Sequence, residues 1–284
     1  MAADCSLLLC AAVACFIANP VGGWQSIAEA SAVMIPISAL PAILWQDRKN
    51  FERRDAALTL PWTFVLIALI PTVAVLSTRF RFPLRDALFI QIDRAMGFSI
   101  PGMMAWSNAH PYLGTLLDRS YPLIFLLIPV AAILPPLLGK REAAEQFVVA
   151  NAIAFTMSFP IFTLLPGVGP WAGYHFSGTE AQKACEASIV ALHRGADASA
   201  AGIVCFPSFH VVWAVLSAWS LQSIKPLRIP SAIVCFLIIV STMTTGWHYV
   251  ADVLAGIAVA AVSIACANLV IRKPAIEPLQ LTRT

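Results

Sequence analysis

Long apolar stretches, each long enough to cross a bilayer, dominate this sequence and leave little choice of fold. Of the 284 residues, 59% are hydrophobic and only 12% are charged, which excludes an ordinary soluble domain. A helix that crosses the hydrocarbon core needs roughly 20 mostly apolar residues. Stretches of about this length, with few or no charges, are residues 5–22, 30–46, 56–78, 120–139, 146–165, 208–224, 229–247 and 253–271. We therefore expect an all-α, polytopic membrane helical bundle with about eight transmembrane helices.

No repeat, low-complexity tract or linker divides the chain, so we expect one integral membrane domain over residues 1–284. Residues 1–46 would contribute two extra N-terminal helices, and residues 56–272 a six-helix catalytic core. The first span lacks the basic lead of a signal peptide but is short and rich in small residues. Its retention and its removal, which would leave seven helices, both stay open.

The positions of Lys and Arg predict the orientation of this bundle. The short turns at residues 46–55, 140–145 and 222–228 are rich in basic residues and fall on the same side. Because basic residues favour cytoplasmic loops, both termini are expected in the cytoplasm and the opposite face in the periplasm or lumen. The net charge of +3 is explained by these loops, so nothing in it points to a nucleic-acid partner.

Two long connections are predicted on the outer face. In residues 79–118, apolar and charged residues alternate at helical spacing, which favours a helix lying in the membrane interface and framing a pocket. The apolar residues are Leu84, Leu88, Ile92 and Met96, and the charged ones are Arg85, Asp86, Asp93 and Arg94. We expect Pro101-Gly102 to end this segment, and an irregular stretch to follow around Trp106, Pro111 and Tyr112.

The second outer connection, residues 166–205, contains two cysteines, Cys185 and Cys205. An oxidising compartment would allow them to pair. Two cysteines form no diagnostic framework, so a disulfide and two free thiols both stay open.

Polar residues at the ends of the last three spans are the candidates for chemistry. His248 and Asp252 are four residues apart, so on a helix the carboxylate could accept a hydrogen bond from the imidazole, provided that the helix begins by His248. This arrangement suits a histidine nucleophile that attacks phosphorus. His210 could protonate the departing oxygen, and Ser208 with the amide groups of its helix start could bind phosphate oxygens.

Simpler interpretations exist for each residue alone. A histidine at a membrane boundary is often only an interfacial hydrogen-bonding group. The His248-Asp252 pair could also bind a metal, but no third ligand stands at a fixed spacing, so we expect neither a metal nor a cofactor.

The combination Pro207-Ser208-Phe209-His210 and Ser241-Thr242-(five residues)-His248-(three residues)-Asp252 resembles the type 2 phosphatidic acid phosphatase superfamily. Members carry a Pro-Ser-Gly-His motif and a Ser-Arg-(five)-His-(three)-Asp motif on consecutive membrane helices. The resemblance implies that His248 is the nucleophile and forms a phosphohistidine. Asp252 would orient it, His210 would act as acid and base, and Ser208 would bind phosphate.

The sequence departs from the family pattern in three places. Phe209 replaces the motif glycine, Thr242 replaces the motif arginine, and the usual upstream Lys-(six)-Arg-Pro motif is absent. With these departures the chain is more similar to the branch that contains inositol phosphorylceramide synthases. A phosphate still needs cationic partners, because an unpaired oxyanion is strongly disfavoured in a low-dielectric site. We expect Arg194 first, and Lys183 or Arg94 second, to supply this charge.

The sequence thus predicts a metal-independent membrane enzyme whose partners are membrane lipids and a lipid phosphate or phospholipid substrate. Phosphatase activity at the extracytoplasmic face is the first expectation. Headgroup transfer to a hydroxylated lipid acceptor, as in inositol phosphorylceramide synthase, is the alternative within the same chemistry. A different class of function is a non-catalytic lipid-binding or transport protein. The absence of the motif Arg and Lys residues would be consistent with a protein that has lost phosphate binding.

Overall fold

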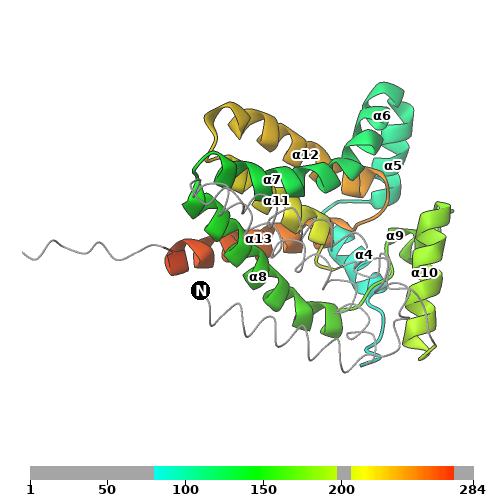
Figure 1. Ribbon diagram of the computed structural model, residues 1–284. Helices are drawn as coiled ribbons and strands as arrows, with labels where there is room; N and C mark the ends of the chain where they lie inside the picture. The colour runs from blue at the N-terminus through cyan, green and yellow to red at the C-terminus, as the bar shows by residue number, and fades with distance from the viewer. Residues whose placement is uncertain (1–79, 197–205, 272–284) are drawn as a thin grey trace, which may run out of the picture.

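The computed structural model of the protein describes residues 80–196 and 206–271, which form helices and no strand (Figure 1). The described helices are, in chain order, α4 (Asp86–Ala95), α5 (Ile100–Ala109), α6 (Pro111–Ser120), η1 (Tyr121–Leu123), α7 (Ile124–Leu137), α8 (Arg141–Leu164), α9 (Pro170–Gly173), α10 (Glu180–His193), α11 (Phe209–Leu221), η2 (Lys225–Leu227), α12 (Arg228–Thr244) and α13 (Val250–Ile271). The prediction of an all-α fold is therefore confirmed for this part of the chain.

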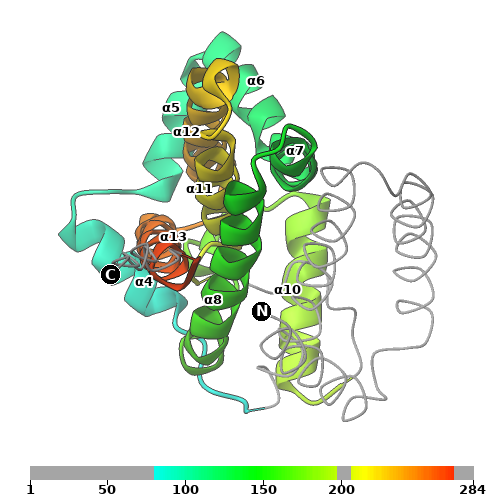
Figure 2. The same ribbon diagram turned by 60° about the vertical axis from the view of Figure 1, so that its left-hand side comes forward.

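Helices α7, α8, α11, α12 and α13 form a bundle, in which α11 packs against the other four (Figures 1 and 2). Its interior is apolar, and many of its fully buried residues are alanines, including Ala131, Ala150 and Ala154. Small residues let helix backbones approach closely, which is how helices gain packing energy inside a membrane.

Within residues 80–196 and 206–271, four helical segments are long and apolar enough to cross a membrane, which supports the expected integral membrane protein. They are Pro111–Leu137, Arg141–Leu164, Lys225–Thr244 and Val250–Ile271. The span expected at 208–224 is a shorter apolar helix, Phe209–Leu221, because Ser208 caps its start and the chain turns after Leu221. The spans expected at 5–22, 30–46 and 56–78 lie outside the described residues, so the count of eight and the six-helix core stay predictions.

The connection before the bundle differs from the expected single helix and irregular stretch. Residues 86–120 form three helices, α4, α5 and α6. Ser99 caps α5 by accepting the Gly102 amide, and Pro101 lies in the first turn. Pro111 likewise opens α6. Proline is favoured in the first turn of a helix, because a backbone N–H there has no acceptor within the helix and its absence costs no hydrogen bond. These prolines therefore start helices here instead of ending one.

Helix α4 is amphipathic, as the sequence indicates. Its inner face buries Phe89, Ile90 and Asp93, whereas Leu88 and Ile92 remain 39% and 37% exposed on the outer face. An apolar face left open in this way fits the expected helix at the membrane interface.

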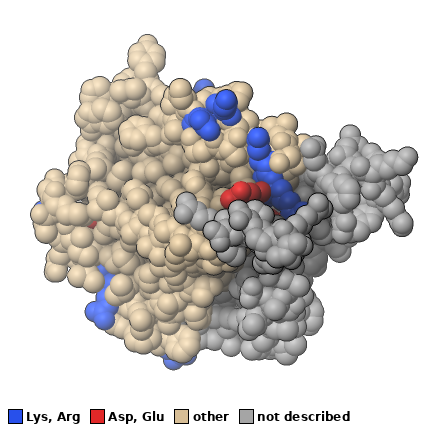
Figure 3. Space-filling model, turned by 90° about the vertical axis from the view of Figure 1, so that its left-hand side faces the viewer, with Lys and Arg blue, Asp and Glu red and all other residues tan. Residues whose placement is uncertain are grey.

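The two ends of the bundle differ in character. The α7–α8 and α11–α12 turns lie at one end and contain Lys140, Arg141, Lys225 and Arg228. Figure 3 views the molecule from that side, where scattered Lys and Arg groups interrupt a mostly uncharged surface. Helices α4, α9 and α10 lie at the other end, next to the start of α13 (Figure 1).

Candidate active site

The starts of α11 and α13 meet directly, which brings the two sequence motifs together. The Ser208 amide donates a hydrogen bond to the Asp252 carbonyl oxygen (3.1 Å). Gly256, one turn further along α13, allows this approach, because a Cβ atom there would lie 2.7 Å from the Ser208 carbonyl oxygen. The motif residues thus belong to a single site at one end of the bundle.

A tight turn after α12 positions His248 in this site. Gly246 has φ +74°, a conformation that favours glycine, and the amides of Trp247 and His248 both donate to the Thr242 carbonyl oxygen (3.0 Å each). From α10, the Gln182 side chain donates to the Thr245 and Gly246 carbonyls (3.2 Å each). These bonds hold the backbone just before His248.

The expected His248–Asp252 pair is present. Nδ1 of His248 lies 3.3 Å from Oδ2 of Asp252, and both side chains are buried. The pairing was expected on the condition that the helix begins by His248, but α13 begins two residues later, at Val250. The contact forms nevertheless, and the Asp252 carboxylate also accepts the Tyr249 amide (2.9 Å). Because a carboxylate only accepts hydrogen bonds, Nδ1 is the donor, and Nε2 keeps the lone pair that a nucleophile needs.

His210, the second residue of α11, lies across from this pair. The ring centroids of His210 and His248 are 6.0 Å apart. Tyr121 stacks on His210 with ring centroids 4.6 Å apart, and the edge of Phe125 packs nearby. Nε2 of His210 is buried and has no hydrogen-bond partner among the described residues. A nitrogen in this position can exchange a proton with a substrate oxygen, as general acid–base catalysis requires.

Ser208 is fully buried and is the N-cap of α11, where its Oγ accepts the Val211 amide (3.4 Å). This cap places the hydroxyl beside the free amides of the first helical turn. Its role as a phosphate ligand stays a prediction.

The cations expected to bind substrate lie at the surface of the described residues. Nζ of Lys183 pairs with Glu180 on α10 (2.8 Å) at the surface, and Arg94 and Arg194 are exposed. Within the described residues, no hydrogen bond or ion pair joins these three to Ser208, His210 or His248. Thr242 does not take the place of the motif arginine, because its buried hydroxyl donates to the Ile239 carbonyl (2.7 Å).

Sequence reasoning missed the residues that support the site from α4. Asp93 accepts the amides of Val250 and Ala251 at the start of α13 (3.0 and 2.9 Å). Asp86 accepts the Tyr249 hydroxyl (3.0 Å). Burial raises the pKa of Asp93, and its two amide hydrogen bonds offset part of that rise. The sequence contains one indication of this role: Asp86 and Asp93 are seven residues apart, which places both side chains on the same face of a helix.

Two other features bear on the site. The described residues contain no cluster of three or more His, Cys, Asp or Glu side chains able to hold a metal ion. Cys185 is buried in α10, but Cys205 lies outside the described residues, and so does their expected pairing.

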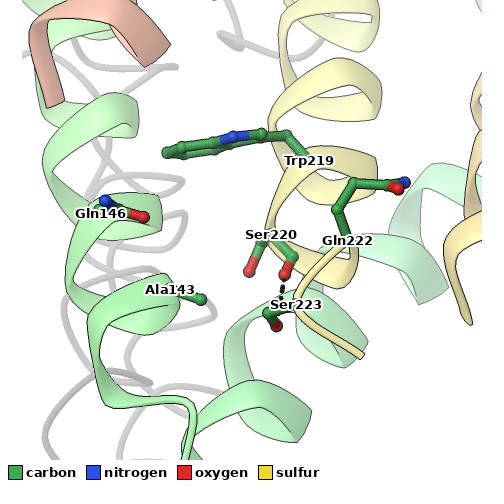
Figure 4. A pocket seen from close by; sticks show the side chains of 6 residues that line it. All are labelled: Ala143, Gln146, Trp219, Ser220, Gln222 and Ser223. Atoms are coloured by element: carbon green, nitrogen blue, oxygen red, sulfur yellow. Dashed lines mark hydrogen bonds between the residues drawn. The ribbon is translucent and has the colours of Figure 1, made fainter. Parts of the chain in front are cut away.

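A cavity of about 240 Å³ lies elsewhere, between the first turns of α8 and the end of α11 (Figure 4). Trp219 and Gln146 face each other across it, and the Ser223 hydroxyl donates to the Ser220 carbonyl (2.9 Å). Because α11 rises about 1.5 Å per residue, this cavity is roughly 15 Å from His210 and is not part of the site.

Comparison with known proteins agrees with the geometry. No curated protein and no solved structure matches the chain significantly. The family model described as PAP2 superfamily matches residues 87–266, which include α4 after its first residue and every motif residue of the site. Members of this superfamily are generally phosphatases or phosphotransferases. The match covers more than half of the chain, and the chain therefore belongs to the PAP2 superfamily.

Proposed function

We propose that this protein is an integral membrane lipid-phosphate phosphatase that cleaves a phosphoester through a phosphohistidine on His248. The observation that carries the proposal is the buried His248–Asp252 contact of 3.3 Å, with the His210 ring 6.0 Å from the His248 ring. A nucleophile, its orienting carboxylate and a second proton-transfer group are thus close together.

The reaction has two steps. Nε2 of His248 attacks phosphorus, the bond from phosphorus to the lipid oxygen breaks, and His210 gives that oxygen a proton. Asp252 stabilises the positive charge that the attacked ring acquires. Water then gives a proton to His210 and attacks phosphorus, which breaks the phosphorus–nitrogen bond, releases inorganic phosphate and regenerates His248.

We further propose that Ser208 and the amides at the start of α11 bind phosphate oxygens, with Arg194 first, and Lys183 or Arg94 second, as substrate-binding cations. Long, exposed basic side chains can swing toward a bound anion, and Arg can bind phosphate through two hydrogen bonds. The predicted location is the extracytoplasmic face, which the basic turns at the opposite end of the bundle support.

A headgroup phosphotransferase is the second candidate. In this reaction a hydroxyl of a second lipid, instead of water, attacks the phosphohistidine. The observation that favours it is that the Thr242 hydroxyl bonds to its own helix and that, among the described residues, none of the three candidate cations bonds to the histidines. A phosphodiester has a single negative charge and needs fewer cations than a phosphomonoester. The resemblance to the inositol phosphorylceramide synthase branch points the same way.

Trapping the intermediate tests the proposal. Purified protein in lipid nanodiscs is mixed with phosphatidic acid labelled with ³²P, quenched in base and analysed for protein-bound label. We expect an acid-labile label that is lost in His248→Ala and kept in His110→Ala. His110 is a suitable control because it is exposed and its Nδ1 lies 2.8 Å from a carbonyl of its own helix. Turnover should persist in the presence of a chelator.

Absence of both label and turnover across a panel of lipid phosphates would overturn the proposal and favour a non-catalytic lipid-binding or transport protein. The acceptor is tested separately. A labelled phospholipid is supplied with and without a hydroxylated lipid, and the products are separated by chromatography. A water-soluble labelled product in both reactions supports hydrolysis: inorganic phosphate from phosphatidic acid, or the headgroup phosphate from a phosphodiester. A labelled lipid that appears only with the acceptor supports the phosphotransferase.

A further inference from the structure

Helix α4 directs two carboxylates at the segment that contains His248. Asp86 and Asp93 are seven residues apart, which is about two helical turns, so they lie on the same face. Asp93 is fully buried, and its Oδ2 and Oδ1 accept the amides of Val250 and Ala251 at 3.0 and 2.9 Å. These are the first two residues of α13, and they are 157 and 158 residues away from Asp93 in the sequence.

The first amides of a helix have no partner inside the helix and need one from elsewhere. At the start of α13, Asp252 accepts the Tyr249 amide (2.9 Å), and Asp93 accepts the next two. Asp93 thus takes two of these amides, and Asp252 accepts the Tyr249 amide and contacts the His248 ring. If Asp93 did not bind Val250 and Ala251, these amides would compete for the Asp252 carboxylate, and the His248 ring would lose its fixed partner.

Asp86 has a different set of contacts and provides a comparison. Its carboxylate accepts the amides of Val168 (3.0 Å) and Gly169 (2.9 Å) in the loop before α9. Asp86 also accepts the hydroxyl of Tyr249, the residue just before α13 (3.0 Å), and this hydroxyl also donates to the Gly169 carbonyl (3.0 Å). Asp86 therefore holds a loop, whereas Asp93 holds the backbone between His248 and Asp252.

We propose that Asp93 is a positioning residue for phosphoryl transfer: it binds the first amides of α13 so that Asp252 can hold His248 in the tautomer that attacks phosphorus. This inference rests on the proposed function. It predicts that Asp93 acts on the chemical step, because a small displacement of a reacting group lowers the rate even when substrate still binds.

Kinetics of Asp93→Asn test the inference. Asparagine keeps the size of the side chain and one accepting oxygen, but its amide nitrogen cannot accept the second backbone N–H. We expect kcat per folded molecule to fall about 10²-fold, while KM stays within about threefold. The matched control is Asp118→Asn, because Asp118 is exposed on α6 and contacts none of these residues. Its kcat should equal that of the unchanged protein.

A second variant removes the other half of the interaction. Val250→Pro deletes the N–H that donates to Oδ2 of Asp93, at the first helical position, where proline is tolerated. We expect kcat to fall about fivefold to tenfold. This is less than in Asp93→Asn, because the Ala251 bond remains and no backbone N–H is left facing an amide nitrogen that cannot accept it. If Asp93→Asn does not fold, this variant decides the question.

A spectroscopic readout separates this inference from the proposed function. In protein labelled with ¹⁵N at histidine, the His248 nitrogens should report a single tautomer with the proton on Nδ1, and Asp93→Asn should shift them toward a mixture. If the unchanged protein shows neither label nor turnover, the proposed function fails, and the spectrum still tests the positioning. Unchanged kcat and unchanged His248 resonances in both variants would overturn the inference. So would a kcat loss that disappears after correction for folded protein.

Discussion

The interior of the bundle and the end that contains His248 satisfy their buried polar groups in different ways. In the bundle, the side chains of Asn151, Thr163 and Ser263 each donate to a carbonyl four residues earlier in the same helix. At the active-site end, Asp93 and Asp86 bind groups 157 and 163 residues away. These three side chains bond within their own helix, although Ser220 of α11 donates across the bundle to the Ala131 carbonyl of α7 (3.1 Å). The site, in contrast, depends mainly on segments that are distant in the sequence. Substitutions at the site should therefore affect chemistry, and substitutions in the bundle should affect stability.

The largest effect is expected for Asp252→Asn. An amide in place of the carboxylate can no longer stabilise a positive His248 ring or ensure that Nδ1 is the donor, so kcat should fall about 10³- to 10⁴-fold. The measurement is turnover of phosphatidic acid in nanodiscs. Ser263→Ala is the control from the same helix, because its hydroxyl bonds only to the Val259 carbonyl. Similar kcat values for both variants would erase the distinction between the site and the bundle.

Gly256→Ala should affect both chemistry and stability, because this glycine lies where the site joins the bundle. A Cβ atom would be 2.7 Å from the Ser208 carbonyl oxygen and 3.1 Å from Cβ of Val211, so α11 must shift. We expect a loss of about 1 to 3 kcal/mol in unfolding free energy and about a tenfold lower kcat. Gly102→Ala is the control, because its nearest neighbour would be 3.5 Å away. Full activity and stability in Gly256→Ala would contradict the close approach of the two helices.

Leu216→Ala should lower stability without changing kcat per folded molecule. Leu216 is completely buried in the apolar core of the bundle. The expected loss of about 2 kcal/mol is at the lower end for such substitutions, because an unfolded helix stays in lipid and only packing is lost. Thermal unfolding in detergent measures it, with Leu126→Ala, whose side chain is 62% exposed, as the control. A kcat loss in Leu216→Ala beyond the folded fraction would show that the bundle and the site are coupled.

The same contrast explains what the sequence could predict. Apolar length alone predicts the helices of the bundle, because each helix satisfies its own backbone hydrogen bonds. The pairing of His248 with Asp252 was also predictable, because both residues are close in the sequence. The start of α13 at Val250 was not, because Asp93, far away in the sequence, supplies the acceptors for its first amides.

The segment before the bundle shows the limit of local patterns. Pro101 and Pro111 each fit either the end of a helix or the start of one, and only the capping contact of Ser99 and the packing of α5 and α6 on α12 resolve the choice. From the sequence of α4 alone, Asp93 could equally be a charged residue on the solvent side of an interfacial helix. Its burial depends on α13, which no pattern within α4 reveals.

The smallest effect is expected for Arg194→Gln. An exposed cation that reaches toward a bound phosphate contributes about 0.2 to 1 kcal/mol, so KM should rise no more than about fivefold, with kcat unchanged. The rise should shrink at high salt, because exposed charges are screened. Arg228→Gln at the opposite end of the bundle is the control, since Arg228 is exposed and its Nε donates to the Gln222 carbonyl. Equal KM values for the two variants at low salt would reject Arg194 as a substrate-binding cation, and the same comparison would then be made for Lys183 and Arg94.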